Sequence, residues 1–375
     1  MDLSIVIVHF RVKEFLWLCL SSLQEACASI SYEIIVVDNA SQDESQDFIV
    51  GHFKNLHWIQ NTENLGFAKA NNQGVDKAKG KYVLILNPDT VLSKKSIESF
   101  ISFASTKNNF GVIGLKMIDG GGLYLPESKR NIPTPFIALK KLLGKNKAYY
   151  ADDLNNKDVG EVDVLPGACM LLKRSVYVDV GGFSEDFFMY GEDIDLCFRL
   201  LKEGFKNYYF GYGTMIHFKG ESTRKDAVYY KNFYGALQIY FEKHYNNYAV
   251  LRHLNKFLVK SLIVSKTYRK SGKLKSTKKE NIIYLGNRSE RSEQIRSTLS
   301  PKKWIYTFDI EKDLGEYDTL LIDQDYFGFD QIIDFFQQKK LLHLKKRIVL
   351  KGKNIVLGSD DSDQQGEILM IHQLT

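Results

Sequence analysis

The first hundred residues alternate short apolar runs with segments of helical periodicity. The apolar runs are LSIVIVHF, YEIIVVD, LHWIQN and KYVLIL. Runs without polar alternation are typical of parallel strands that helices cover on both faces. Between the first two runs, Phe15, Cys19 and Leu23 follow helical spacing. The alternation predicts an α/β fold with a mostly parallel central sheet and helices on both faces.

Polar side chains stand where the predicted strands end. They are His9, Asp38, Asn61 and Asp89. Open parallel sheets bind their ligands beyond the carboxyl ends of the strands. We therefore expect these four side chains to converge on one crevice.

Length and composition predict a globular chain of more than one unit. The chain has 375 residues, of which 44% are hydrophobic and 26% charged. We expect a large N-terminal domain at 1–223, a helical basic segment and linker at 224–280, and a small α/β domain of unknown role at 281–375. The four cysteines show no metal-binding spacing. Together with the lack of a signal peptide and of a run of ~18 apolar residues, this predicts a cytoplasmic protein.

Positive charge is concentrated in one segment. Residues 219–280 contain 15 Lys or Arg and four acidic residues, a charge of +11, so the net charge of +6 leaves −5 for the rest. One basic segment indicates a local anionic partner and argues against nucleic acid. With Phe257, Leu258 and Ile263 among its lysines, it predicts a peripheral contact with the inner face of the cytoplasmic membrane. A solvated face or a docking surface for the C-terminal unit is the alternative.

Asp38 and the tripeptide at 87–89 each have a functional and a structural interpretation. Asp38 can accept the N3–H of a uracil or thymine ring, with Asn39 or Ser41 orienting the nucleotide, or it can cap the next helix. Asn87 and Asp89 offer oxygen ligands for Mg²⁺ or Mn²⁺. Alternatively, Asn-Pro-Asp is an ordinary proline turn.

Three acidic residues crowd the start of another predicted helix: Glu192, Asp193 and Asp195. The helix dipole favours a carboxylate there by only ~0.3–1 kcal/mol. Crowding raises the pKa of one carboxyl group toward the value useful in a general base. The preceding Phe188 and Tyr190 offer faces for a sugar ring, or they belong to the core.

Two further residues have open interpretations. His217, at another strand end, is a metal ligand or a structural histidine. Lys69, near a helix start, is a phosphate contact or a surface lysine. Its segment, NLGFAKANNQG, lacks both GxGxxG and GxxxxGK[ST], which argues against a Rossmann dinucleotide site and a P-loop.

The order of the motifs is more specific than any one of them. The chain contains, in this order, SIVIVHF, EIIVVDNAS, ENLGFAKANNQG, LILNPDT, VLPGACMLLKR, GGFSEDFFMYGEDIDLC and IHFKG. From residue 3 to about 245 it closely resembles the family 2 glycosyltransferases, especially the bacterial rhamnosyltransferase-like branch. The resemblance implies a GT-A fold, a nucleotide-sugar donor, a divalent metal and inversion at the anomeric carbon.

The resemblance also implies roles for individual residues. Asp38 matches the base-contacting aspartate, and Asp193 matches the general base. Asp89 matches the second, metal-binding carboxylate of the family's Asp-x-Asp, in which Asn87 replaces the first, and His217 matches a late histidine near the metal. Further donor-side candidates are His9, Asn39, Ser41, Asn64, Gly66, Lys69 and Gly167. The acceptor-side candidates are Phe188, Tyr190 and Glu192.

We therefore predict an inverting sugar transferase of cell-surface polysaccharide synthesis that requires Mg²⁺ or Mn²⁺. Its first expected donor is dTDP-rhamnose, with UDP-sugars second, and its acceptor is a glycan or a lipid-linked glycan. The alternative is a catalytically inactive homologue that binds glycan or scaffolds an assembly. The missing glycine fingerprint disfavours a nucleotide-binding oxidoreductase.

Overall fold

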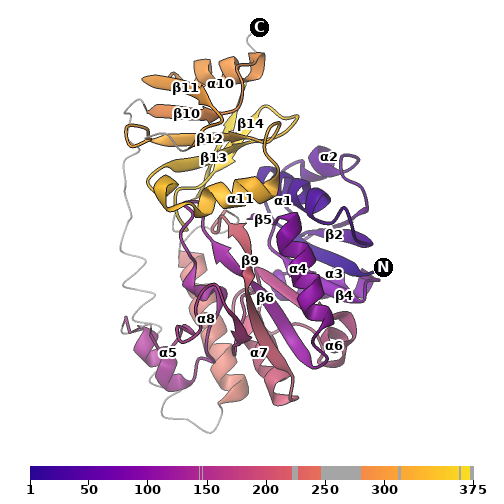
Figure 1. Cartoon of the computed structure of the whole chain (residues 1–375). Helices are drawn as coiled ribbons and strands as arrows, with labels where there is room; N and C mark the ends of the chain where they lie inside the picture. The colour runs from indigo at the N-terminus through magenta and orange to yellow at the C-terminus, as the bar shows by residue number, and fades with distance from the viewer. Residues whose placement is uncertain are drawn as a thin grey trace.

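The computed structural model describes residues 1–142, 144–145, 147–221, 227–245, 280–310, 314–362 and 365–371. Within these ranges the chain forms a nine-stranded and a six-stranded sheet, which Figure 1 shows as two stacked units. Most of the predicted basic segment, residues 246–279, lies outside the described residues. Among the helices that are described, none is both long and apolar enough to cross a membrane.

The first half of the large sheet confirms the predicted alternation of strands and helices. Strand β1 pairs in parallel with β2 and β4, and β2 pairs in parallel with β3. Every residue of β1, β2 and β4 is buried, because helices cover both faces of the sheet. The elements are β1 (Leu3–His9), α1 (Lys13–Ala26), β2 (Tyr32–Asp38), α2 (Ser45–Ile49), β3 (Leu56–Gln60), α3 (Phe67–Lys77) and β4 (Tyr82–Leu86).

Beyond β4 the sheet is mixed. The strand order is β3-β2-β1-β4-β8-β6-β9-β5, with β7 beside β9. Strand β8 is antiparallel to both β4 and β6, whereas β6 and β9 are parallel. The elements are β5 (Thr90–Val91), α4 (Lys94–Ser105), β6 (Phe110–Ile118), α5 (Pro135–Leu142), β7 (Val159–Glu161), β8 (Cys169–Lys173), α6 (Arg174–Asp179), α7 (Glu192–Lys202), β9 (Lys206–His217) and α8 (Ala227–His244). This arrangement confirms the predicted GT-A type fold class.

The C-terminal unit is a second α/β layer, as the sequence predicts. Its strand order is β11-β10-β12-β13-β14-β15, and the first four of these strands are parallel. The elements are β10 (Asn281–Leu285), α10 (Glu290–Leu299), β11 (Lys303–Thr307), β12 (Thr319–Asp323), α11 (Phe329–Gln337), β13 (Lys345–Val349), β14 (Ile355–Gly358) and β15 (Glu367–Met370). The role of this unit and the domain boundaries at 223 and 280 stay predictions.

One hydrophobic core joins the two units. Helix α11 lies between the second sheet and the first unit (Figure 1). The ring of Phe218, just after β9, lies 5.1 Å from that of Phe15 in α1 and 6.4 Å from that of Phe336 in α11, measured between centroids. Buried residues of both units form a single contiguous cluster. The contact between the units therefore resembles a domain interior more than a loose interdomain surface.

Candidate active site

Residues that follow the carboxyl ends of β1, β2, β4 and β9 line a cavity of about 420 Å³. The first turn of α7 and the irregular segment between β6 and β8 complete its wall. The predicted site residues that line it are Asn39, Asn64, Asn87, Asp89, Gly167, Tyr190, Glu192, Asp193 and His217. The structure thus brings donor-side, metal-side and acceptor-side candidates to one cavity.

Pairing of β5 with β9 places Thr90 opposite His217 and so sets His217 beside Asp89. The Nε2 atom of His217 lies 3.4 Å from Oδ1 of Asp89 and 3.3 Å from Nδ2 of Asn87. Both Asp89 and His217 are buried. Among the described residues, neither Asp89 Oδ1 nor His217 Nδ1 has a hydrogen-bond partner. Buried polar atoms usually have one, so these two atoms indicate a missing ligand.

The chemistry of this cluster fits a hard divalent cation. Asp89 supplies a carboxylate, Asn87 can supply an amide oxygen, and His217 supplies an imidazole. Mg²⁺ is commonly held by one or two carboxylates, and substrate phosphates and water complete its shell. Within the described ranges, no three or more His, Cys, Asp or Glu side chains gather as a metal site. A cation at Asp89 would therefore need oxygen atoms from a diphosphate.

Across the cavity from Asp89 and His217, the carboxylate of Asp193 is bound by the guanidinium of Arg130. Its Oδ2 atom accepts hydrogen bonds from Nη2 of Arg130 at 2.6 Å and from the Gly167 N–H at 3.1 Å. Burial alone would lower the pKa of Arg130, but the Asp193 carboxylate and the Tyr149 hydroxyl outweigh burial and raise this pKa. The guanidinium thus stays charged and orients the carboxylate at the cavity.

Glu192 lies in a different environment from its neighbour. It is buried, and its Oε2 atom has no hydrogen-bond partner among the described residues. Burial, and then the negative charge of Asp193, raise the pKa of Glu192 to about 8. The predicted effect of acid crowding therefore falls on Glu192. Burial therefore favours the neutral form of Glu192, beside an Asp193 that is ion-paired with Arg130.

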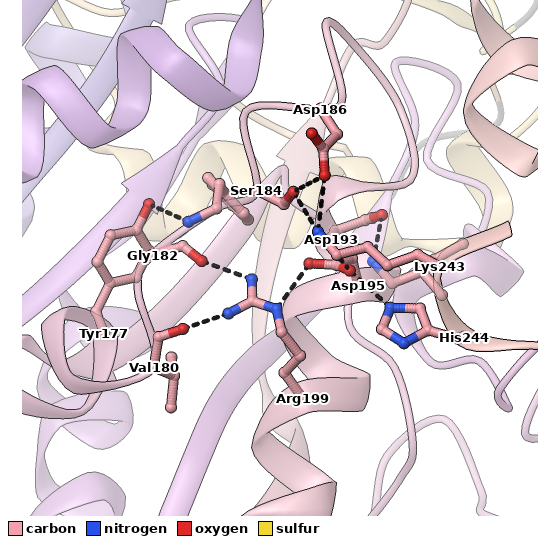
Figure 2. Close-up of polar contacts among 12 residues, drawn as sticks. Tyr177, Val180, Gly182, Ser184, Asp186, Asp193, Asp195, Arg199, Lys243 and His244 are labelled. Carbon is pink, nitrogen blue, oxygen red and sulfur yellow. Dashed lines mark hydrogen bonds and ion pairs between the residues drawn. The ribbon is translucent and has the colours of Figure 1, made fainter. Parts of the chain in front are cut away.

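Asp195, the third acid of the motif, does not line the cavity. It is fully buried and bonds to Nε of Arg199 at 2.8 Å and to Nε2 of His244 at 2.7 Å. Figure 2 shows the guanidinium of Arg199 between Asp195 and the loop after α6, where it donates to the carbonyl oxygen of Gly182 at 2.6 Å. Because His244 ends α8, this network ties α7 to α8. Asp195 is a structural residue.

The backbone before α7 is in an uncommon conformation. Tyr190 and Gly191 have φ angles of 70° and 83°, both in the left-handed region that non-glycine residues seldom adopt. This turn directs Glu192 and Asp193 at the cavity. Such strain persists where surrounding packing fixes it and is frequent at functional sites.

Gly66 and Phe188 connect α3 to the loop before α7. The Phe67 N–H donates to the Phe188 carbonyl oxygen at 2.7 Å. A Cβ atom on Gly66 would lie 2.4 Å from that oxygen, and Gly66 has a φ of 82°. Gly66 is therefore required by close packing. The side chain of Phe188 is exposed, and neither residue lines the cavity.

Several candidates lie beside the cavity but do not line it. Asp38 accepts a hydrogen bond from the Ser41 N–H at 2.8 Å, within the turn after β2, and it does not cap the next helix, α2, whose N-cap is Glu44. His9 is fully buried and lies 2.6 Å from the Ser45 hydroxyl, and Lys69 is exposed. Of the four strand-end residues expected to converge, only Asp89 lines the cavity: Asp38 bonds within its own turn, His9 bonds to Ser45, and Asn61 bonds to Asn39 and Gln73. Donor contacts by His9, Asp38, Ser41 and Lys69 stay predictions.

Sequence reasoning missed the cations of the site. Arg130 and Lys141 line the cavity from the segment between β6 and β8, and Lys219 lines it after β9. The Nζ atom of Lys141 lies 3.1 Å from the ring centroid of Tyr149. Arg130 and Lys141 fall in a stretch without periodicity, so no local pattern indicates them. Lys219 stands two residues after His217 in the IHFKG motif, which offers a usable signal.

A second cavity, of about 400 Å³, adjoins the first on the far side of Asp193. Both cavities share Arg130, Glu192 and Asp193. Helices α5 and α8 form the outer wall of the second cavity, and this wall is largely aromatic. Its aromatic residues are Tyr149, Tyr150, Tyr190, Tyr229, Tyr230, Phe233, Tyr234 and Tyr240. Aromatic faces of this kind suit a sugar ring or an apolar chain.

Comparison with known proteins gives matches over the same region. The model of the family "Glycosyl transferase family 2" matches residues 4–181. The low-salt glycan biosynthesis hexosyltransferase Agl10 of Haloferax volcanii is 28% identical over 270 residues, which cover 71% of this chain and 78% of Agl10.

Two rhamnosyltransferases are also similar. The N-acetylglucosaminyl-diphospho-decaprenol L-rhamnosyltransferase of Mycobacterium tuberculosis is 28% identical over 214 residues, covering 52% of this chain and 69% of that protein. Rhamnosyltransferase WbbL of Escherichia coli is 32% identical over 203 residues, covering 52% of this chain and 75% of WbbL.

Proposed function

Because this chain belongs to glycosyl transferase family 2, we propose that it transfers a sugar from a nucleoside-diphosphate donor to an acceptor hydroxyl, with inversion at the anomeric carbon. One observation carries the proposal. A single cavity holds the Asp89–His217 cluster on one wall and the Arg130-bound Asp193 on the other. A diphosphate and an acceptor hydroxyl would each meet a suitable group there.

The proposed reaction is a single displacement. The acceptor oxygen attacks C1 of the donor sugar, its proton passes to Asp193, and the bond from C1 to the diphosphate oxygen breaks. Arg130 and the Gly167 N–H hold the Asp193 carboxylate in place for this transfer. A divalent cation held by Asp89 and His217, with Asn87 beside them, would neutralise charge on the leaving diphosphate. The reaction leaves the nucleoside diphosphate and requires no covalent intermediate.

For the donor, we propose dTDP-rhamnose first and a UDP-sugar second. Two of the relatives described above are named rhamnosyltransferases, and Agl10 is named a hexosyltransferase. A thermal-shift screen of dTDP-rhamnose, UDP-glucose, UDP-N-acetylglucosamine and GDP-mannose, with and without Mn²⁺, tests this. We expect a dTDP- or UDP-sugar to raise the melting temperature, and Mn²⁺ to enlarge the rise. No shift with any of them would contradict the proposal.

For the acceptor, we propose a glycan or lipid-linked glycan that enters through the aromatic second cavity. The cavity shares Asp193 with the donor side, so an acceptor hydroxyl there would lie beside the proposed base. The name of the M. tuberculosis relative specifies a lipid-diphosphate acceptor.

Membrane contact by the basic segment is part of the same proposal. Its charge of +11 would attract anionic lipids, where lipid-linked acceptors reside. We expect the chain to sediment with anionic vesicles at low salt and to be released at high salt, because salt screens the attraction. Equal sedimentation with neutral and anionic vesicles would contradict the membrane contact.

A further inference from the structure

The C-terminal unit reaches the donor cavity. Ser362, between β14 and β15, lines the 420 Å³ cavity. Among the described residues that line it, all others belong to the first unit and α8. Ser362, which lies between two strands of the C-terminal unit, thus belongs to the same cavity wall as Asp89, His217 and Lys219.

The segment before Ser362 is packed tightly on the first unit. A Cβ atom on Gly120 would lie 2.2 Å from Oγ of Ser359, and one on Gly121 would lie 2.6 Å from the carbonyl oxygen of Asp360. Both glycines are therefore needed for the close approach of the two chain segments. The Lys346 ammonium, from β13, adds a hydrogen bond to the Gly121 carbonyl at 2.8 Å.

Residues on both sides of Ser362 are also bound by a side chain of the C-terminal unit itself. Arg347 of β13 is buried, and its Nη2 atom lies 2.6 Å from Oδ1 of Asp360 and 3.0 Å from Oε2 of Glu367. One guanidinium thus binds the two ends of the connection between β14 and β15. Asp360 and Glu367, on either side of Ser362, are thus both bound to β13.

Glu221 joins this connection to the segment that follows β9. The Gly366 N–H donates to both carboxylate oxygens of Glu221, at 2.8 and 2.9 Å. The side-chain amide of Gln365 donates to the Glu221 carbonyl oxygen at 3.1 Å. Between Glu221 and β9 lie Lys219 and Gly220, which both line the cavity.

The burial of Glu221 needs an explanation. Desolvation raises the pKa of Glu221 to about 8, although the Gly366 N–H and the more distant charge of Arg347 oppose the rise. Among the described residues, no Lys or Arg lies close enough to Glu221 for an ion pair. Burying a carboxyl group with only neutral hydrogen-bond donors costs stability. A residue of this kind is retained more readily where its position serves the neighbouring site.

We propose that Glu221 is a positioning residue through which the C-terminal unit shapes the nucleoside-diphosphate end of the cavity. By accepting the Gly366 N–H, it fixes residues 217–221 against the β14–β15 connection, so that Lys219 and Ser362 form one wall. The inference rests on the proposed function, because it takes the cavity to bind a nucleoside diphosphate. It gives the C-terminal unit a role in donor binding.

Calorimetric titration of the full chain with UDP and with dTDP, in Mn²⁺, tests the inference. Glu221→Ala should weaken nucleotide binding by about tenfold, because residues 217–221 lose the hydrogen bond from the Gly366 N–H that holds them in place. Glu221→Gln should bind within about threefold of the unchanged protein, since the amide oxygen still accepts the Gly366 N–H. With the donor, the loss should appear in KM more than in kcat. A purely structural role would instead lower the melting temperature of Glu221→Ala and leave KM unchanged.

A second variant covers the case in which Glu221→Ala does not fold. Ser362→Trp should fill the wall and weaken nucleotide binding by about tenfold or more. Its matched control is Ser297→Trp, on the exposed face of α10, which should bind as the unchanged protein does. Normal binding by both Glu221→Ala and Ser362→Trp overturns this inference alone. Failure of the unchanged protein to bind either nucleotide overturns it together with the proposed function.

Discussion

At the scale of single residues, the start of α7 holds two neighbouring carboxyl groups in opposite environments. Asp193 is paired with Arg130 at 2.6 Å, whereas Glu192 is buried without a cation and has a pKa raised to about 8. Environments that separate two carboxyl groups in this way commonly assign them different roles in one reaction. We assign proton acceptance to Asp193 and a neutral, hydrogen-bonding role to Glu192.

This assignment predicts a pH dependence. Below about pH 8 Glu192 is protonated, and above it a second negative charge faces the cavity beside Asp193. The kcat/KM of transfer should therefore fall as the pH rises through 8, because the added charge repels the donor diphosphate. Glu192→Gln, which is neutral at every pH, should keep transfer near pH 7 and lose this decline. If Glu192→Gln abolishes transfer at pH 7, Glu192 and not Asp193 accepts the proton.

The sequence predicted part of the site for a physical reason. Asp89 and His217 stand at strand ends, and strand ends converge in an α/β sheet, so local patterns were sufficient to find them. Arg130 comes from an irregular segment whose path depends on packing against α7, which no local pattern encodes. Asp38 and His9 are also at strand ends, but Asp38 bonds within its own turn and His9 bonds to Ser45 at the start of α2, so neither lines the cavity.

At the scale of elements, the contact between α7 and α8 depends on Asp195. Its bonds to Arg199 and His244 join the first turn of α7 to the end of α8 (Figure 2). The same two helices carry the acids and part of the aromatic wall of the second cavity. The network therefore fixes two helices that line the second cavity, although Asp195 itself does not line it.

We expect Asp195→Asn to lower the free energy of unfolding by about 3–5 kcal/mol, because it removes the charge of a fully buried carboxylate that binds Arg199 and His244. Burial would raise the pKa of Asp195, but His244 and then Arg199 outweigh burial and lower it. The stabilisation is thus full above the unfolded pKa of ~3.9 and is lost as the pH falls through the lower folded value.

Urea unfolding at about pH 7 and at successively lower pH measures this effect. The difference in free energy of unfolding between the unchanged protein and Asp195→Asn should become smaller below pH ~4. Asp186→Asn is the matched control: its carboxylate pairs with Lys243 at 2.9 Å but is exposed, so we expect a loss of about 1 kcal/mol or less. If both variants lose the same free energy of unfolding, the buried network around Asp195 contributes no more stability than an exposed ion pair.

Most strands of the C-terminal unit can be predicted from the sequence, and the exception is β15. Strands β10 to β14 coincide with the apolar runs NIIYLG, KWIYTF, DTLLID, RIVL and NIVLG, each of which predicts a strand. Strand β15 has no such run, because it is an edge strand whose residues are mostly exposed. Its pairing with β14 is determined by the sheet, not by its own composition.

At the scale of the whole molecule, the shared core should make the two units unfold together. The buried cluster runs from α1 through Phe218 to α11 without interruption. Scanning calorimetry should accordingly give one cooperative transition. Two separate transitions would show that the units are independent domains.

Phe336→Ala should test this core. The side chain is fully buried at the contact between the units, so its truncation should cost about 3–5 kcal/mol of unfolding free energy. Phe308→Ala, in the same unit, is the control, because Phe308 is half exposed and its loss should cost far less. A similar change in both variants would contradict a core-like contact.

The central claim is that one cavity separates donor binding at Asp89 from proton acceptance at Asp193. Calorimetric titration of Asp89→Ala and Asp193→Asn with the donor in Mn²⁺ tests it most directly. We predict that Asp89→Ala loses Mn²⁺-dependent donor binding, whereas Asp193→Asn binds the donor normally although its transfer falls by roughly 10²–10⁴-fold. Loss of donor binding in Asp193→Asn, with normal Mn²⁺-dependent binding in Asp89→Ala, would contradict the account.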